Sequence, residues 1–148
     1  MTSPLRKRGG KRKASDVHGN SSGHGHLLAK GARLAKLKPS ATEFFKVDIG
    51  EGVQLDGWMI KPPDFDSQKR YPVLFYVYGE PWGQTVLDRW GGRDRVWHQM
   101  LAQHGYIVMS VDNRGTPAPR GRAWRKIIYR KMGIVNSGDQ AAAARAIA

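Results

Sequence analysis

Two short polar segments follow apolar runs of the sequence, and both carry residue types that can do chemistry. Tyr78-Gly79-Glu80-Pro81 ends the run Pro72–Tyr78, and Asp112-Asn113-Arg114-Gly115 follows Tyr106–Val111. A tyrosine hydroxyl can donate a hydrogen bond to developing negative charge, a carboxylate can accept a proton, and a guanidinium group can hold an anion. Two alternatives remain open from the residues alone: the second segment is either catalytic or a structural turn, and Tyr78 is either a functional donor or an aromatic residue of a buried strand.

Another chemical pattern lies near the N-terminus, where residues 19–23 (GNSSG) fit the G-x-S-x-G pattern of a serine nucleophile. This nucleophile needs a strand before it and a helix after it, which hold the serine in a strained, exposed turn. The flanking residues are rich in Lys, Arg, Gly and His, so we interpret the match at Ser21 as chance. His18, His24 and His26 lack the carboxylate or cysteine that would complete a ligand set, and neither a metal nor a cofactor is expected.

Four segments predict the strands that position the polar residues. Thr42–Ile49 and Val53–Ile60 alternate between apolar and polar residues around the turn signal Gly50-Glu51-Gly52, which predicts an antiparallel hairpin. Pro72–Tyr78 and Tyr106–Val111 are continuous apolar runs, typical of strands that are buried on both faces of a parallel sheet.

A helix is predicted between the two apolar runs, over Arg95–His104. Its apolar residues recur at helical spacing, which predicts that one face packs on the core with Trp97, Met100 and Leu101. Its two histidines, His98 and His104, are expected to be surface or packing residues.

A second helix is predicted over Ser137–Ala148, with Ser137 or Asp139 as its N-cap. The strand–helix–strand unit from Pro72 to Val111 implies a parallel pair with a right-handed crossover. The whole order predicts an α/β architecture with an antiparallel hairpin at one edge. Open α/β sheets bind ligands at the carboxyl ends of their strands, where the two polar segments lie.

The net charge of +13 is distributed unevenly. Residues 1–40 carry ten of the 25 Lys and Arg residues but only one of the 12 acids, Asp16, and few large apolar side chains. Such a composition cannot bury enough apolar surface to fold, which predicts a disordered basic tail or linker over residues 1–40 and a domain over residues 41–148. The tail favours an alternative function, nonspecific binding to nucleic acid or an acidic surface. It lacks interleaved aromatic residues for base stacking, so no specific nucleic-acid partner is expected.

The lack of cysteine and of long apolar runs bears on several further kinds of site and protein. The chain has no cysteine, which excludes disulfides, thiolate catalysis and cysteine metal sites. No apolar run approaches the ~20 residues of a membrane helix, and no apolar segment follows the basic residues 6–8 as it would in a secretion signal. These features leave the location open between cytoplasm, periplasm and the cell exterior.

Four segments, in order and with plausible spacing, resemble the prolyl oligopeptidase family of serine peptidases, and most of all its dipeptidyl peptidase IV branch. They are Leu55–Asp66 (LDGWMIKPPDFD), Tyr71–Pro81 (YPVLFYVYGEP), Trp97–Gly121 (WHQMLAQHGYIVMSVDNRGTPAPRG) and Gly138–Ile147 (GDQAAAARAI). The resemblance covers roughly residues 34–148. It implies a partial α/β-hydrolase sheet, with the antiparallel hairpin followed by parallel strands and helices, preceded by the disordered basic tail.

The resemblance also implies roles for the polar residues. In this family a tyrosine in a V-Y-[AG]-x-P context donates its hydroxyl to the oxyanion, and Tyr78 matches that position. Glu80 and Trp82 flank Tyr78 and are candidates for the substrate pocket, although Trp82 stands where a small residue is expected. Asp112 and Arg114 are expected to organise the loops around the site.

By the same resemblance, the catalytic serine, aspartate and histidine fall beyond Ala148, and a β-propeller would precede Leu34. We therefore expect the chain to be the N-terminal portion of the catalytic domain, inactive alone, from an enzyme that releases N-terminal dipeptides, preferentially after proline. The expected partners are a peptide substrate in the full-length enzyme, and the missing C-terminal part or a second copy of the chain. Pro72–Tyr78 would lack its neighbouring strand and form an exposed apolar edge.

Overall fold

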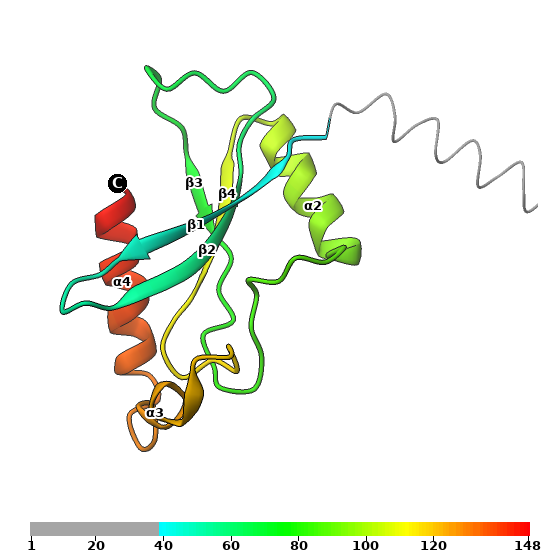
Figure 1. The fold of residues 1–148 in the computed structure, drawn as a ribbon. Coiled ribbons are helices and arrows are strands. Elements are labelled where there is room, and N and C mark those ends of the chain that lie inside the picture. Colours follow the sequence, from blue (N-terminus) through cyan, green and yellow to red (C-terminus); the bar gives the residue numbers. More distant parts are fainter. Residues whose placement is uncertain (1–38) are drawn as a thin grey trace, which may run out of the picture. The chain divides into compact units, whose positions relative to one another are not determined.

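The structure, a computed structural model, describes residues 39–148, so the predicted basic tail lies almost entirely outside the described residues. The strands and helices follow the predicted order, with one additional short helix (Figure 1). The elements are β1 Thr42–Asp48, β2 Gln54–Ile60, β3 Val73–Phe75, α2 Gly92–Gln103, β4 Ile107–Asp112, α3 Gly121–Lys126 and α4 Val135–Ile147. No helix in this part of the chain is long and apolar enough to cross a membrane.

The strands form one mixed sheet in the order β1-β2-β4-β3. β2 pairs antiparallel with both β1 and β4, and β3 pairs parallel with β4. β4 has a neighbour on each side, and its residues Val108–Asp112 are all buried. The predicted hairpin, the parallel pair and the α/β architecture are therefore confirmed.

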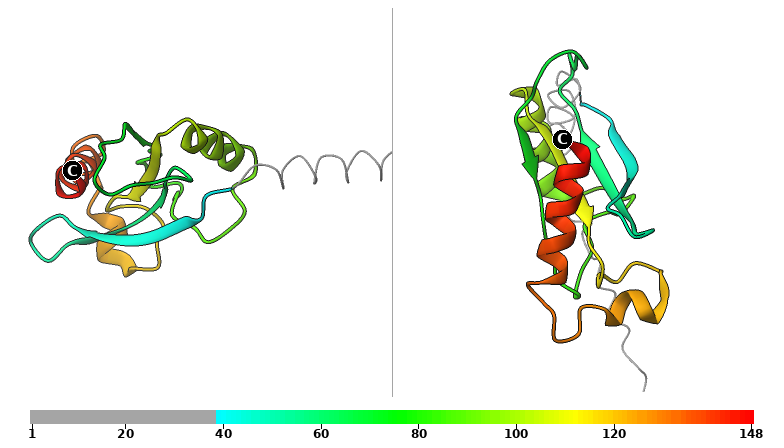
Figure 2. Two further views of the ribbon diagram at one scale, coloured as in Figure 1. Left: turned by 90° about the horizontal axis from the view of Figure 1, so that it is seen from above. Right: turned by 90° about the vertical axis from the view of Figure 1, so that its left-hand side faces the viewer.

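The two longer helices lie on either side of the sheet (Figure 2). Successive side chains of a strand point to opposite faces, and β4 supplies both faces. Val111 packs in an apolar cluster with Ala143 of α4, whereas Val108 packs in a second cluster with Ala102 of α2. Each face of the sheet therefore has its own small apolar core, and β4 joins the two.

β3 is shorter and more exposed than its sequence predicts. Only Val73–Phe75 form the strand, and Val73 and Val77 are 48% and 46% exposed. The prediction of burial on both faces is wrong because β3 is an edge strand with β4 as its single neighbour. The expectation of an exposed apolar edge is confirmed for this segment.

The predicted core face of α2 is wrong for two of its three residues. Trp97 and Met100 are about half exposed, and the buried positions are His98 and Ala102, with Leu101 packed partly against them. The His98 ring lies 5.2 Å from the ring of Trp58 on β2. His98 and Ala102 therefore form the side of α2 that packs toward Trp58, while Trp97 and Met100 lie on the exposed side.

α4 begins at Val135, two residues before its predicted start. Its N-cap position is Ile134, which makes no side-chain capping hydrogen bond, so both predicted caps are wrong. Ser137 is exposed, and Asp139 is buried in a contact described below. α3 escaped prediction because its six residues are too few to show a helical period.

Gly57 on β2 gives a test of the packing between the first two strands. It pairs with Phe45 of β1, and a Cβ at position 57 would lie 2.5 Å from the Phe45 Cζ atom. Gly57→Ala should therefore overpack this site and lower the free energy of unfolding by about 1–3 kcal/mol, measured by urea denaturation. In the control Gly138→Ala, no atom lies within 4 Å of the new methyl group, and stability should stay the same or rise. Equal stability of the two variants would contradict the packing described here.

Candidate functional site

The loops that leave the carboxyl ends of β3 and β4 are joined by hydrogen bonds. We call residues 76–91 the β3–α2 loop and residues 113–120 the β4–α3 loop. Asn113 donates from Nδ2 to the Gly79 carbonyl at 3.2 Å, and Asn136 of α4 donates to the same oxygen at 3.0 Å. The two polar segments therefore meet at one edge of the sheet, as the parallel pairing of β3 and β4 requires.

Tyr78 lies in the β3–α2 loop with its side chain 49% exposed. Its ring passes so close to Gly83 that a Cβ there would lie 3.2 Å from Tyr78 Cε1. Within residues 39–148 no hydrogen bond of the Tyr78 hydroxyl is found, so this O–H is available to a ligand. The backbone before it is fixed, because Tyr76 donates its N–H to the Met109 carbonyl at 2.8 Å.

Glu80 and Trp82 lie in the same loop as Tyr78, and both side chains point into solvent, Trp82 with 77% of its surface exposed. Neither is among the residues that line the cavity between β2, the β3–α2 loop and α2. Their predicted role in a substrate pocket stays a prediction.

Asp112 is buried at the end of β4 and binds the middle of the β3–α2 loop. Its carboxylate accepts hydrogen bonds from the N–H of Thr85 at 2.8 Å, from the Thr85 hydroxyl at 2.8 Å and from the N–H of Val86 at 3.0 Å. The Thr85 hydroxyl also lies 2.6 Å from the Ser110 hydroxyl, which donates to the Tyr76 carbonyl. These contacts hold the loop against the sheet.

Arg114 connects the β4–α3 loop to α4. Its guanidinium group donates to both carboxylate oxygens of Asp139, with the shortest contact at 2.7 Å, and its backbone N–H donates to the same carboxylate at 2.9 Å. The hydrogen bond to Asp139 raises the pKa of Arg114 above its ordinary value despite partial burial. The Asp139 carboxylate is buried. It binds Arg114 and does not cap α4 as the sequence predicts.

Four polar residues that no sequence pattern indicates also hold this edge of the sheet together: Thr85, Ser110, Asn136 and Gln140. Gln140 donates from Nε2 to the Val111 carbonyl at 2.7 Å and to Asn113 Oδ1 at 3.2 Å. All four act through hydrogen bonds to residues at least 25 positions away. No local pattern of residue types indicates such contacts, although their partner Asn113 lies in the polar segment Asp112-Asn113-Arg114-Gly115.

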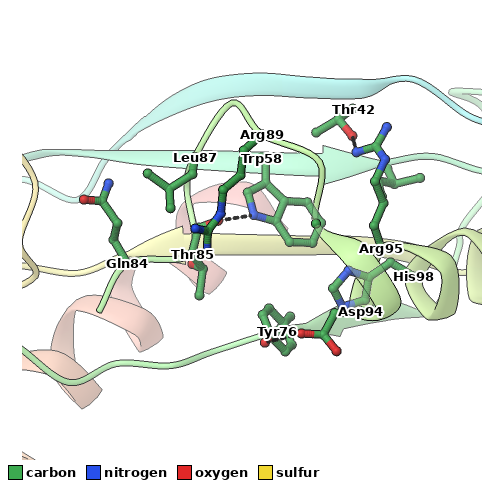
Figure 3. A pocket seen from close by; sticks show the side chains of 12 residues that line it. Thr42, Trp58, Tyr76, Gln84, Thr85, Leu87, Arg89, Asp94, Arg95 and His98 are labelled. Atoms are coloured by element: carbon green, nitrogen blue, oxygen red, sulfur yellow. Dashed lines mark hydrogen bonds between the residues drawn. The ribbon is translucent and has the colours of Figure 1, made fainter. Parts of the chain in front are cut away.

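A small cavity of about 140 Å³ lies between β2, the β3–α2 loop and α2 (Figure 3). Trp58, Tyr76 and His98 form its aromatic wall, and the Trp58 Nε1–H donates to the Thr85 carbonyl at 3.0 Å. His98 was expected to be either a surface or a packing residue. It is a packing residue, with its ring 4.8 Å from that of Tyr76. Tyr78 does not line this cavity, so the candidate donor and the cavity are separate features.

No hydrogen bond joins a serine to a histidine within residues 39–148. In this part of the chain no group of three or more His, Cys, Asp or Glu side chains is placed to hold a metal ion. Three features of the sequence lie outside the described residues: the pattern at residues 19–23, the neighbouring histidines, and the charged part of the basic tail proposed to bind nucleic acid or an acidic surface. Their interpretations stay predictions.

The comparison with known sequences finds peptidases. Residues 93–148 match the prolyl oligopeptidase family. The probable dipeptidyl-aminopeptidase B of Arthroderma gypseum is 35% identical over 133 residues, and the dipeptidyl peptidase 4 of Trichophyton rubrum is 32% identical over 116 residues. These alignments cover 86% and 78% of this chain but only 14% and 15% of the relatives. The chain thus spans a small part of the length of the relatives that it matches.

Solved structures give the same result. The dipeptidyl peptidase 4 of Porphyromonas gingivalis matches with a TM-score of 0.72 and 42% identity, over 81% of this chain and 16% of that chain. The acylaminoacyl peptidase of Pyrococcus horikoshii matches with a TM-score of 0.63 and 23% identity, over 78% of this chain and 18% of that chain, which is a likeness of fold alone. The predicted α/β-hydrolase type of sheet is therefore confirmed.

The buried imidazole beside the cavity predicts a pH dependence of stability. Burial lowers the pKa of His98 below its ordinary 6.5, with Asp94 raising it and Arg95 lowering it by smaller effects. Below pH 6.5 the unfolded chain binds a proton that the folded chain resists, so the free energy of unfolding should fall as the pH drops until folded His98 also titrates. Urea denaturation across this range should show that loss in the native chain and a flatter profile in His98→Gln. The exposed His104→Gln variant should keep the native profile, and an unchanged profile in His98→Gln would exclude His98 as the source.

Asp112 predicts a local loss of protection. In Asp112→Asn an NH₂ group replaces either the oxygen that accepts from both Thr85 donors or the oxygen that accepts from Val86, so the hold on the loop at these two residues should weaken. We expect faster amide hydrogen exchange at these two residues and a stability loss of about 1.5–3 kcal/mol. Asp88→Asn changes an exposed carboxylate of the same loop and should alter neither. Native protection of both amides in Asp112→Asn would contradict the anchoring role.

Proposed function

The chain belongs to the prolyl oligopeptidase family of serine peptidases, and from that membership we propose that it supplies the oxyanion donor of a dipeptidyl peptidase active site, through Tyr78. The observation that carries the proposal is the half-exposed tyrosine at the carboxyl end of β3, whose hydroxyl makes no hydrogen bond within the described residues. The relatives named above as dipeptidyl peptidases support the substrate class.

The chemistry of acyl transfer accounts for this role. When a serine attacks a peptide carbonyl, negative charge develops on the carbonyl oxygen, and an O–H donor held in advance at that position stabilises the transition state. Removal of one such donor typically costs about 3 kcal/mol of this stabilisation. A histidine acts as general base toward the serine, and an aspartate orients the histidine.

We propose that the serine, histidine and aspartate come from parts of the catalytic domain outside these 148 residues. The relatives are about seven times as long as the aligned part of this chain, which leaves ample length for them. In this proposal β1–β4 form one side of the catalytic sheet, Asp112 and Arg114 organise its loops, and Glu80 and Trp82 flank the substrate. The substrate is a peptide, cleaved after its second residue and preferentially after proline, as the family resemblance implies.

A chimera tests the role of Tyr78. Residues 42–148 would replace the matching segment of the Porphyromonas gingivalis dipeptidyl peptidase 4, which is similar enough in sequence and fold to accept them. The chimera should release the chromophore from a Gly-Pro chromogenic substrate, and Tyr78→Phe should lower kcat by about 10²–10³-fold with little change in KM.

Tyr129→Phe is the matched control, because Tyr129 is 65% exposed and lies outside the loops described above; it should keep the activity of the chimera. The 148-residue chain alone should release nothing. A Tyr78→Phe chimera with full kcat would refute the proposed donor role.

A further inference from the structure

The carbonyl oxygen of Gly79, the residue after Tyr78, is held by two side-chain amides. Asn113 Nδ2 and Asn136 Nδ2 lie 3.2 and 3.0 Å from it, and these donors come from the end of β4 and the start of α4. A carbonyl oxygen has two lone pairs and can accept both bonds. Gly79 therefore has a fixed position relative to two elements that are distant from it in the chain.

The orientation of each amide is itself fixed. Asn136 Oδ1 accepts the N–H of Gly133 at 2.7 Å, and Asn113 Oδ1 accepts from Gln140 Nε2 at 3.2 Å. Because each oxygen is engaged by a donor, each NH₂ group is directed toward Gly79. Asn113 is fully buried, so water does not compete for its bonds.

Gly79 also has a backbone conformation that brings its peptide to the amides. Its φ of +77° lies in the left-handed region, and an added Cβ would sit 3.7 Å from Asn136 Nδ2 and 3.8 Å from Asn113 Oδ1. Two residues before Tyr78, the N–H of Tyr76 binds Met109 and its carbonyl accepts from Ser110. Tyr78 thus lies between two anchored points of the backbone.

We propose that Asn113 and Asn136 are positioning residues that clamp the Gly79 carbonyl and thereby fix the backbone that carries the Tyr78 hydroxyl. The inference rests on the proposed function of Tyr78 and extends it to two residues that do not touch the reacting atoms. An oxyanion donor works only when it is held in place before the reaction, and an error of about 1 Å in such a group can cost a factor of ~10² in rate. Because Tyr78 is half exposed, side-chain packing holds it less firmly than it would hold a buried residue, and its position depends also on its backbone.

Asn136→Asp is the sharper variant, because Asn136 is only partly buried and the aspartate keeps the oxygen that Gly133 binds. It removes the NH₂ donor and places a carboxylate oxygen opposite the Gly79 carbonyl. Asn136→Ala removes both contacts. Ser137→Ala changes the next, exposed residue of α4 and is the matched control.

The first measurement is made on the 148-residue chain by ¹⁵N relaxation, which needs no activity. The backbone order parameters of Tyr78 and Gly79 should fall from about 0.85 to below about 0.6 in both Asn136 variants, and stay native in Ser137→Ala. Native order parameters in both variants would overturn the clamp.

The second measurement uses the chimera and separates positioning from general stability. Asn136→Asp should lower kcat by about 10- to 100-fold, with KM nearly unchanged, and should cause no further loss in a Tyr78→Phe background. A loss that is as large in Tyr78→Phe as in the parent chimera, or no loss in either, would overturn the positioning role. If Tyr78→Phe alone keeps full kcat, the proposed function fails, and the order parameters then decide the clamp by themselves.

Discussion

The site and both apolar cores depend on the pairing of β4 with a neighbour on each side. Because β3 runs parallel to β4, their carboxyl ends meet at one edge of the sheet. The last residue of β4 and the two residues after it each hold a different point: Asp112 holds the β3–α2 loop at Thr85, Asn113 holds it at Gly79, and Arg114 holds α4. The place of β4 in the sheet thus sets the relative positions of the loop and α4.

This edge is held by polar contacts rather than by apolar packing. Asp112, Asn113 and Asp139 are buried, and each has charged or amide partners that satisfy it. A buried polar group without its partner costs about 1–3 kcal/mol, more for a charge, so loss of one member of such a network leaves others unpaired. These directional hydrogen bonds give the β3–α2 loop one specific orientation, which non-directional apolar packing would not.

Local patterns in the sequence predict most of the strands and helices, and fail where distant residues decide. Alternation predicted the β1–β2 hairpin, and the apolar runs predicted the parallel pair, because these signals reside in neighbouring residues. The exposure of Trp97 and the burial of His98 depend on the indole of Trp58, about forty positions earlier, which no helical period reveals. The place of Tyr78 after a strand follows from the apolar run Pro72–Tyr78, whereas its role as oxyanion donor is implied only by the family resemblance. The amide of Asn136, 57 positions from the carbonyl that it binds, carries no sequence signal of its own.

The strand order also determines when each strand can pair during synthesis of the chain. The chain emerges from the ribosome with β2 complete at Ile60 and β3 complete at Phe75, yet the partner of both begins only at Ile107. At about 5–20 residues per second, β2 waits roughly 2–10 s for β4. Throughout that interval the hairpin and β3 keep their apolar side chains uncovered. The arrival of β4 completes the sheet, whereas the contacts of Asn136 and Asp139 have to await α4, which begins only at Val135. Assembly of the candidate site is therefore later than assembly of the sheet.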